Sequence, residues 1–106
     1  MPKYLFHGSY TKEGLKGFLK EGGSKRREAT KKMIESVGGT LEAYYFAFGE
    51  NDFYVIADVP DNKRAAAGSL VASASGTVKA RTVVLLTPEE VDEVVKMTVE
   101  YRPPGQ

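Results

Sequence analysis

The order in which strand-like and helix-like segments follow one another restricts the fold of this chain most. Alternation of apolar and polar residues predicts four strands, at residues 4–10, 41–48, 53–59 and 78–86. Helical spacing of apolar residues predicts helices at 11–21, 24–37, 62–74 and from 87 onward. The resulting order is the split βαβ pattern of a ferredoxin-like βαββαβ fold, with a broken first helix and an added C-terminal helix. We therefore expect an α+β domain whose four-stranded antiparallel sheet has helices on one face.

Glycines and capping residues set the expected helix boundaries. The pair Gly22-Gly23 interrupts the first helix, and Ser24 is expected to cap its second piece. Asp61 is well placed to cap the helix that follows the third strand. The clearest local signal is Thr87-Pro88-Glu89-Glu90, because it has the spacing of a capping box and a proline in the first helical turn.

The composition indicates one small and nearly neutral domain. The chain has 106 residues, 15 basic and 14 acidic side chains, and no cysteine. We place a single domain at residues 1–100 and a flexible tail at 101–106. The balanced charge gives no long-range field for nucleic acid, and the lack of cysteine excludes disulfides and thiolate metal sites. No segment has the roughly 20 apolar residues of a membrane helix, so we expect a cytoplasmic protein without nucleic-acid or membrane partners.

The strand that follows the first helical region indicates an oligomer. Alternation places Tyr44, Phe46 and Phe48 on the side of the sheet away from the helices, together with Tyr54 and Ile56. Such a face is too apolar to remain open to solvent. We therefore expect a second copy to stack on it, as a homodimer or higher homo-oligomer. A shift of one residue in register would invert this assignment.

Several short motifs are spread over almost the whole chain. They are Tyr10-Thr11-x-x-Gly14, Ser24-x-Arg26-Arg27-Glu28, Gly38-Gly39, Phe48-Gly49-Glu50-Asn51-Asp52, Pro60-Asp61 and Thr87-Pro88-Glu89-Glu90. In these motifs the chain resembles the GYD family, small bacterial and archaeal proteins of largely unassigned function. The resemblance implies a ferredoxin-like fold of the dimeric α/β barrel type, and it implies no settled activity. Asn51 occupies the position of the tyrosine in the family's name motif, so any ligand role of that tyrosine is lost or altered here.

His7 and Asp58 are the candidate catalytic residues. His7 is the only histidine, and a histidine can act as a general base near neutral pH. It has no companion at metal-ligand spacing, so we expect no metal site and no cofactor. An ordinary strand residue is the favoured interpretation of His7. For Asp58, a functional carboxylate and an ion pair at the sheet edge are both open.

Candidate ligand-binding residues come from two regions. Tyrosines offer a stacking ring and a phenol, and charged groups inside a cavity often mark a site. These arguments select Tyr10, Tyr44, Tyr54, Asp58 and Arg81. Packing in a core or an interface is nevertheless the favoured role for most of the tyrosines. Ser24 and Arg27 form a candidate anion site at a helix start, although a solvated basic surface explains the same residues.

Three functions follow from these observations. The first is an oligomeric small-molecule-binding module, with its cavity between helices and sheet or between two sheets. The second is a cofactor-independent, oxygenase-like enzyme on phenolic substrates, which analogy with other dimeric α/β barrel proteins implies, with His7 or Asp58 as the base. The third is a structural or regulatory subunit. The residues do not decide whether the chain is an enzyme.

Overall fold

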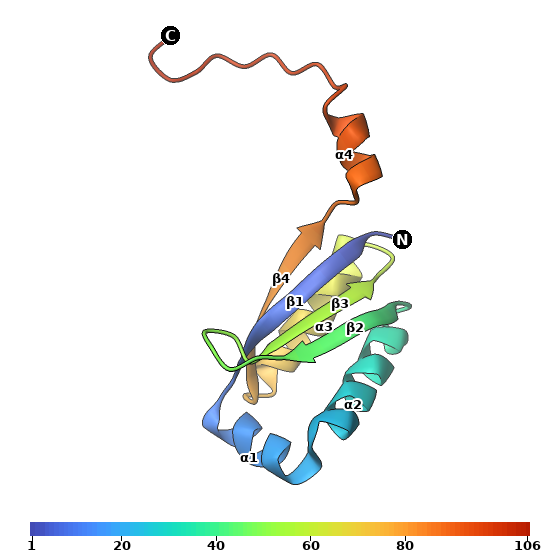
Figure 1. Ribbon diagram of the computed structural model, residues 1–106, viewed down its shortest axis with the longest axis vertical. Helices are drawn as coiled ribbons and strands as arrows, with labels where there is room; N and C mark the ends of the chain where they lie inside the picture. The colour runs from blue at the N-terminus through green and yellow to red at the C-terminus, as the bar shows by residue number, and fades with distance from the viewer.

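The strands and helices follow the order expected from the sequence. The computed structural model describes all residues, 1–106, and Figure 1 shows their arrangement. The strands are β1 (Lys3–Tyr10), β2 (Thr40–Phe46), β3 (Phe53–Asp58) and β4 (Val78–Leu85). The helices are α1 (Lys12–Glu21), α2 (Gly23–Ser36), α3 (Asn62–Ala74) and α4 (Pro88–Val94).

The four strands form one antiparallel sheet in the order β2-β3-β1-β4. Helix α2 packs against β2 and α3 packs against β4, so the two helices lie over opposite edges of the sheet. Helix α1 connects β1 to α2 at one end of the sheet (Figure 1). This arrangement confirms the ferredoxin-like α+β fold, with a broken first helix and a C-terminal helix.

Local capping explains where three of the helices begin. The Thr11 hydroxyl accepts a hydrogen bond from the Gly14 amide, and the Asp61 carboxylate accepts one from the Arg64 amide at 2.9 Å. Thr87 and Glu90 form the complete capping box expected from the sequence.

The expectation for Ser24 was wrong. Helix α2 begins one residue earlier, at Gly23, and has no side-chain cap. Gly22 (φ 80°) ends α1 by donating its amide to the Phe18 carbonyl at 2.8 Å, and it is at the same time the residue before α2. Because the positive φ of Gly22 makes the turn between the helices, Ser24 already lies inside α2.

The core lies between the sheet and the helices. Its buried side chains come mainly from one face of β1 and β3, with one residue each from α2 and α3: Tyr4, Ile34, Phe53, Val55, Ala57, Val59 and Ala65. The Tyr4 hydroxyl donates to the Asn62 side chain at 2.6 Å, which satisfies this buried phenol and ties β1 to α3.

A register shift in β2 reverses part of the expected face assignment. The pairing of β2 with β3 is irregular between Leu41 and Ala43. After this β-bulge, Tyr44 pairs with Val55 and Phe46 with Phe53, which are both core residues. Tyr44 and Phe46 therefore face the helices, and their expected place on the opposite face was wrong.

The other face of the sheet carries no helix, and we call it the open face. The strand registers place on it Lys3, Leu5, His7, Tyr45, Tyr54, Ile56, Asp58, Lys79, Arg81, Val83 and Leu85. Tyr54 and Ile56 lie there as expected from the sequence. This face is mixed, with an apolar centre and charged groups toward its ends.

The C-terminal segment leaves the domain after β4. Figure 1 shows α4 and the residues after it extending beyond the end of the sheet. Every residue from Pro88 to Gln106 is exposed, including Val91, Val94 and Val95, which have the spacing of one helix face. The helix forms as the sequence predicts, but it does not pack on the rest of its own chain.

Candidate functional site

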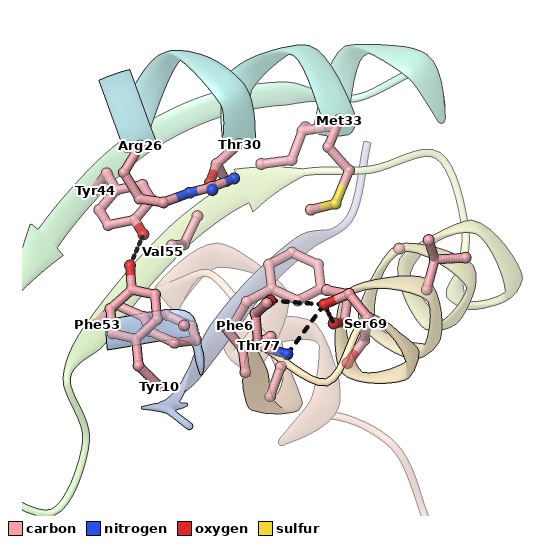
Figure 2. A pocket seen from close by; sticks show the side chains of 18 of the residues that line it. Phe6, Tyr10, Arg26, Thr30, Met33, Tyr44, Phe53, Val55, Ser69 and Thr77 are labelled. Carbon is pink, nitrogen blue, oxygen red and sulfur yellow. Dashed lines mark hydrogen bonds between the residues drawn. The ribbon is translucent and has the colours of Figure 1, made fainter. Parts of the chain in front are cut away.

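A cleft lies between α2 and α3 over the helix-covered face of the sheet. Its volume is about 450 Å³, and all four strands and the first three helices contribute to its lining. Phe6, Tyr44 and Val55 belong to the floor, while Met33 and Ser69 come from the two helical walls (Figure 2). The cleft has the size and the mainly apolar lining of a small-molecule site.

Small residues on the helices leave this cleft open. A Cβ atom added at Gly17 of α1 or Gly68 of α3 would meet no other atom within 4 Å, and both glycines line the cleft. Glycine inside a helix is less favourable than alanine by up to about 1 kcal/mol. Gly14 is different, because its Cβ would lie 1.9 Å from the Thr77 carbonyl oxygen. Close packing therefore explains why position 14 is a glycine, whereas Gly17 and Gly68 border empty space.

Aromatic rings close one end of the cleft. Phe18 of α1 contacts Tyr10 and Phe46, with ring centroids 5.2 Å and 5.0 Å apart. Tyr44 packs beside Phe46 with a centroid distance of 4.8 Å, and Tyr10 packs on Phe53 at 5.5 Å. These distances are typical of favourable aromatic pairs, so this end of the cleft offers packed ring edges and faces to a ligand.

Two phenol groups meet at the same end. The hydroxyl oxygens of Tyr10 and Tyr44 lie 3.3 Å apart, as the dashed line in Figure 2 shows. Burial raises the pKa of Tyr10 far above its ordinary value of 10.0, and the hydrogen bond to Tyr44 acts in the same direction. Tyr10 is therefore a neutral phenol at physiological pH. Since only one hydroxyl donates to the other, the second hydroxyl proton is free for a further acceptor.

Arg26 brings a positive charge to this end of the cleft. Its side chain extends from α2 beside Tyr44 and Thr30 (Figure 2). One guanidinium nitrogen donates to the Glu21 carboxylate at 3.3 Å, and about a third of the side chain is exposed. A guanidinium has five donor hydrogens, so the Glu21 contact leaves donors for a carboxylate or another anionic group.

Sequence reasoning missed Arg26, although a signal was present. Arg26, Thr30, Met33 and Val37 all line the cleft. Their spacing of four, three and four residues follows one face of a helix. The sequence analysis assigned Arg26 to no ligand site, whereas its position on the helix puts it on the cleft side.

The five expected ligand-binding residues are divided between the two faces of the sheet. Tyr10 and Tyr44 line the cleft together. Tyr54, Asp58 and Arg81 lie on the open face, and none of them lines the cleft. The structure therefore does not bring the five into one site.

Both candidate catalytic residues also lie on the open face. The His7 Nδ1 atom is 3.1 Å from the Asn51 side-chain oxygen, and the Asn51 amide nitrogen donates to the Tyr54 hydroxyl at 3.3 Å. The His7 and Tyr54 rings are stacked with centroids 6.1 Å apart. Asn51, at the position of the family tyrosine, thus joins these two rings at the rim of the open face.

Asp58 lies at the opposite end of the open face, in an ion pair. Lys3 Nζ contacts an Asp58 oxygen at 3.0 Å and a Glu42 oxygen at 2.6 Å. The hydrogen bond to Glu42, followed by that to Asp58, raises the pKa of Lys3. Asp58 therefore has the ion pair that the sequence left open as one of two alternatives.

The candidate anion site at Ser24 and Arg27 is on the exposed side of α2. Both residues are exposed, and the Arg27 guanidinium lies 3.9 Å from the carboxylate of the adjacent Glu28. Arg27 borders a shallow hollow beside β2, whereas its neighbour Arg26 turns into the cleft.

Two further properties of the chain bear on the kind of site. No group of three or more histidine, cysteine, aspartate or glutamate side chains is arranged to hold a metal ion. None of the helices has both the length and the apolar character needed to cross a membrane.

Comparison with known proteins gives one match. The family model described as the GYD domain matches residues 4–95, which covers the four strands and four helices except Lys3 at the start of β1. No curated protein and no solved structure shows a significant match to the chain.

Proposed function

This chain belongs to the GYD domain family, and on that premise we propose that it is a small-molecule-binding module. Its site is the cleft between α2, α3 and the sheet. The observation that carries the proposal is the combination of about 450 Å³ of mainly apolar space with polar groups at one end. An apolar pocket with a few convergent polar groups is the usual form of a ligand site.

The lining defines the chemistry of the ligand. The apolar floor and the aromatic end suit an aromatic or aliphatic body, because burying apolar surface drives binding. Arg26 and the free hydroxyl proton of the Tyr10–Tyr44 pair suit a carboxylate, sulfonate or phenol oxygen. We therefore infer an amphiphilic ligand with one hydrogen-bond-accepting or anionic end.

The geometry favours binding over the oxygenase-like alternative. In that alternative His7 or Asp58 would abstract a phenolic proton. Both residues lie on the open face, on the opposite side of the sheet from the cleft. Within the cleft the only two phenols hydrogen-bond to each other, and Tyr10 holds its proton at neutral pH. Of the two carboxylates that line the cleft, Glu21 is paired with Arg26, and Glu13 lies in the first turn of α1.

A pair of matched variants of α3 tests the proposal. The probe is 1-anilinonaphthalene-8-sulfonate, which has an aromatic body and an anionic end. Gly68→Leu places a side chain into the cleft, whereas Ala67→Leu adds the same side chain at an exposed neighbouring position outside it. We expect saturable probe fluorescence with one probe per chain. The affinity for the probe should be unchanged in Ala67→Leu and at least about tenfold lower in Gly68→Leu. Equal affinities in the two variants would contradict the proposal.

A further inference from the structure

The C-terminal arm, which we define as residues 87–101, has the properties of a segment made to pack on another surface. Val91, Val94 and Val95 form an apolar stripe on α4, and Met97, Val99 and Tyr101 continue the apolar content beyond it. All six are exposed, from 42% for Val91 to 78% for Val99. A helix of seven residues is too short to be stable in water without packing, so α4 requires a surface that its own domain does not provide.

The open face is an unpartnered surface of matching chemistry. Leu5, Ile56, Val83 and Leu85 make its centre apolar, and Tyr54 is 38% exposed there. A contiguous apolar area on a sheet face that no helix covers marks an interaction site.

The C-terminal segment and the rest of the chain carry net charges of opposite sign. Residues 87–106, the arm together with the tail that follows it, carry five acidic and two basic side chains, a net charge of −3. This leaves 13 basic and nine acidic side chains, a net charge of +4, on residues 1–86. On the open face, Lys79 and Arg81 of β4 form no ion pair within the chain, and neither do the carboxylates of α4.

From these three observations we propose that the C-terminal arm of one chain docks on the open face of a second copy, in a reciprocal exchange. The valine stripe covers the apolar centre, and the acidic residues of α4 approach Lys79 and Arg81. Because each copy has one arm and one open face, the exchange closes as a two-fold symmetric dimer. The proposed contact lies on the side of the sheet opposite the cleft, so it is independent of ligand binding in the cleft.

Disulfide trapping between two different chains tests the contact, because the natural chain has no cysteine. A ¹⁵N-labelled Val94→Cys chain is mixed with an unlabelled Val83→Cys chain, oxidised, and analysed by mass spectrometry without reduction. A disulfide requires Cα atoms within about 7 Å, so a mixed-label dimer reports a contact between arm and open face in trans. The control replaces Val83→Cys with Ala67→Cys, an exposed site on α3.

We expect the mixed disulfide with Val83→Cys to exceed the Ala67→Cys control at least about fivefold, since only the former site lies on the proposed interface. Equal yields for the two sites would overturn the proposal.

Sedimentation equilibrium of the full chain gives a second, independent readout. We expect twice the monomer mass of 11.6 kDa for the natural chain. In the variant Val91→Ser/Val94→Ser/Val95→Ser we expect dimerisation weakened at least about tenfold, with a circular dichroism spectrum that loses no more than the helical signal of the seven residues of α4. A monomeric natural chain, or a dimer that the triple variant leaves intact, would each overturn the exchange.

Discussion

The hydroxyl oxygens of Tyr10 and Tyr44 lie 3.3 Å apart, although their strands are not neighbours in the sheet. Strand β3 separates β1 from β2, and the two phenols meet above Phe53, whose ring packs against both. This contact depends on the β-bulge in β2, which turns Tyr44 toward the helices. It sets a neutral hydrogen-bonding group at the aromatic end of the cleft.

The raised pKa of Tyr10 predicts a loss of stability in alkali. In the unfolded chain Tyr10 loses its proton near its ordinary pKa of 10.0, whereas the folded chain retains it. Above pH 10 the unfolded state therefore binds fewer protons, and the free energy of unfolding falls as pH rises. One proton gives at most about 1.4 kcal/mol per pH unit, and less here because Tyr10 is only partly buried.

The variant Tyr10→Phe isolates this contribution from those of Lys3 and the other tyrosines. Urea unfolding of both proteins between about pH 9 and pH 11.5, a range around the ordinary tyrosine pKa, measures how the free energy of unfolding depends on pH. We expect the natural protein to lose stability more steeply than Tyr10→Phe. Parallel curves would mean that the phenol of Tyr10 titrates normally in the folded protein.

Arg26 is predicted to select anionic ligands. Replacing it with glutamine removes the charge and keeps a polar side chain of similar length. We expect Arg26→Gln to weaken binding of 1-anilinonaphthalene-8-sulfonate about tenfold, in line with a charged hydrogen bond of 1.5–3 kcal/mol. Binding of the uncharged dye Nile red should change little. Lys25→Gln, at the adjacent exposed position, is the control and should leave both affinities unchanged.

The helical glycines are predicted to respond in opposite directions to alanine. Gly68→Ala should raise the free energy of unfolding by about 0.5–1 kcal/mol, because it improves helix propensity and the new methyl group meets no atom within 4 Å. Gly14→Ala should lower it, because its Cβ would lie 1.9 Å from the Thr77 carbonyl oxygen. Chemical denaturation measures both changes, and a destabilised Gly68→Ala protein would show that the cleft is narrower than described.

Two helix caps are predicted to differ in their effect on global stability. Asp61→Ala removes the hydrogen bond to the Arg64 amide on a packed helix and should cost about 1 kcal/mol. Thr87→Ala removes an equally well-formed cap, but α4 does not pack on its own domain. At concentrations where the chain is monomeric, we expect no change in the midpoint of thermal unfolding. A clear loss in Thr87→Ala would mean that α4 belongs to the cooperative core.

Local signals made the order of the elements predictable. Asp61, Thr87 and Glu90 act within one helical turn, so their caps follow from the sequence directly. Ser24 shows the limit of such signals, because Gly22 makes the turn and Gly23 already belongs to the helix. When helix-breaking and helix-capping residues are adjacent, the backbone geometry decides at which of them the helix begins, and this cannot be predicted from the sequence.

Contacts between distant segments explain what could not be predicted. The face of Tyr44 depends on a bulge that forms only when β2 pairs with β3. The position of Arg26 at the cleft depends on how α2 and α3 pack over the sheet. Two of the five expected ligand-binding residues, Tyr10 and Tyr44, lie in the cleft, and the other three lie across the sheet. The helical spacing of Val91, Val94 and Val95 can be recognised in the sequence, but their exposure in the isolated chain cannot.

Chemical-shift mapping of the ¹⁵N-labelled protein with 1-anilinonaphthalene-8-sulfonate shows on which side of the sheet the probe binds. If the cleft is the ligand site, the saturating shifts will be concentrated at the amides of Gly17, Thr30, Tyr44 and Gly68, which line it. Shifts concentrated instead at Leu5, Tyr45 and Tyr54 would place the probe on the open face, and the cleft would then not be the ligand site.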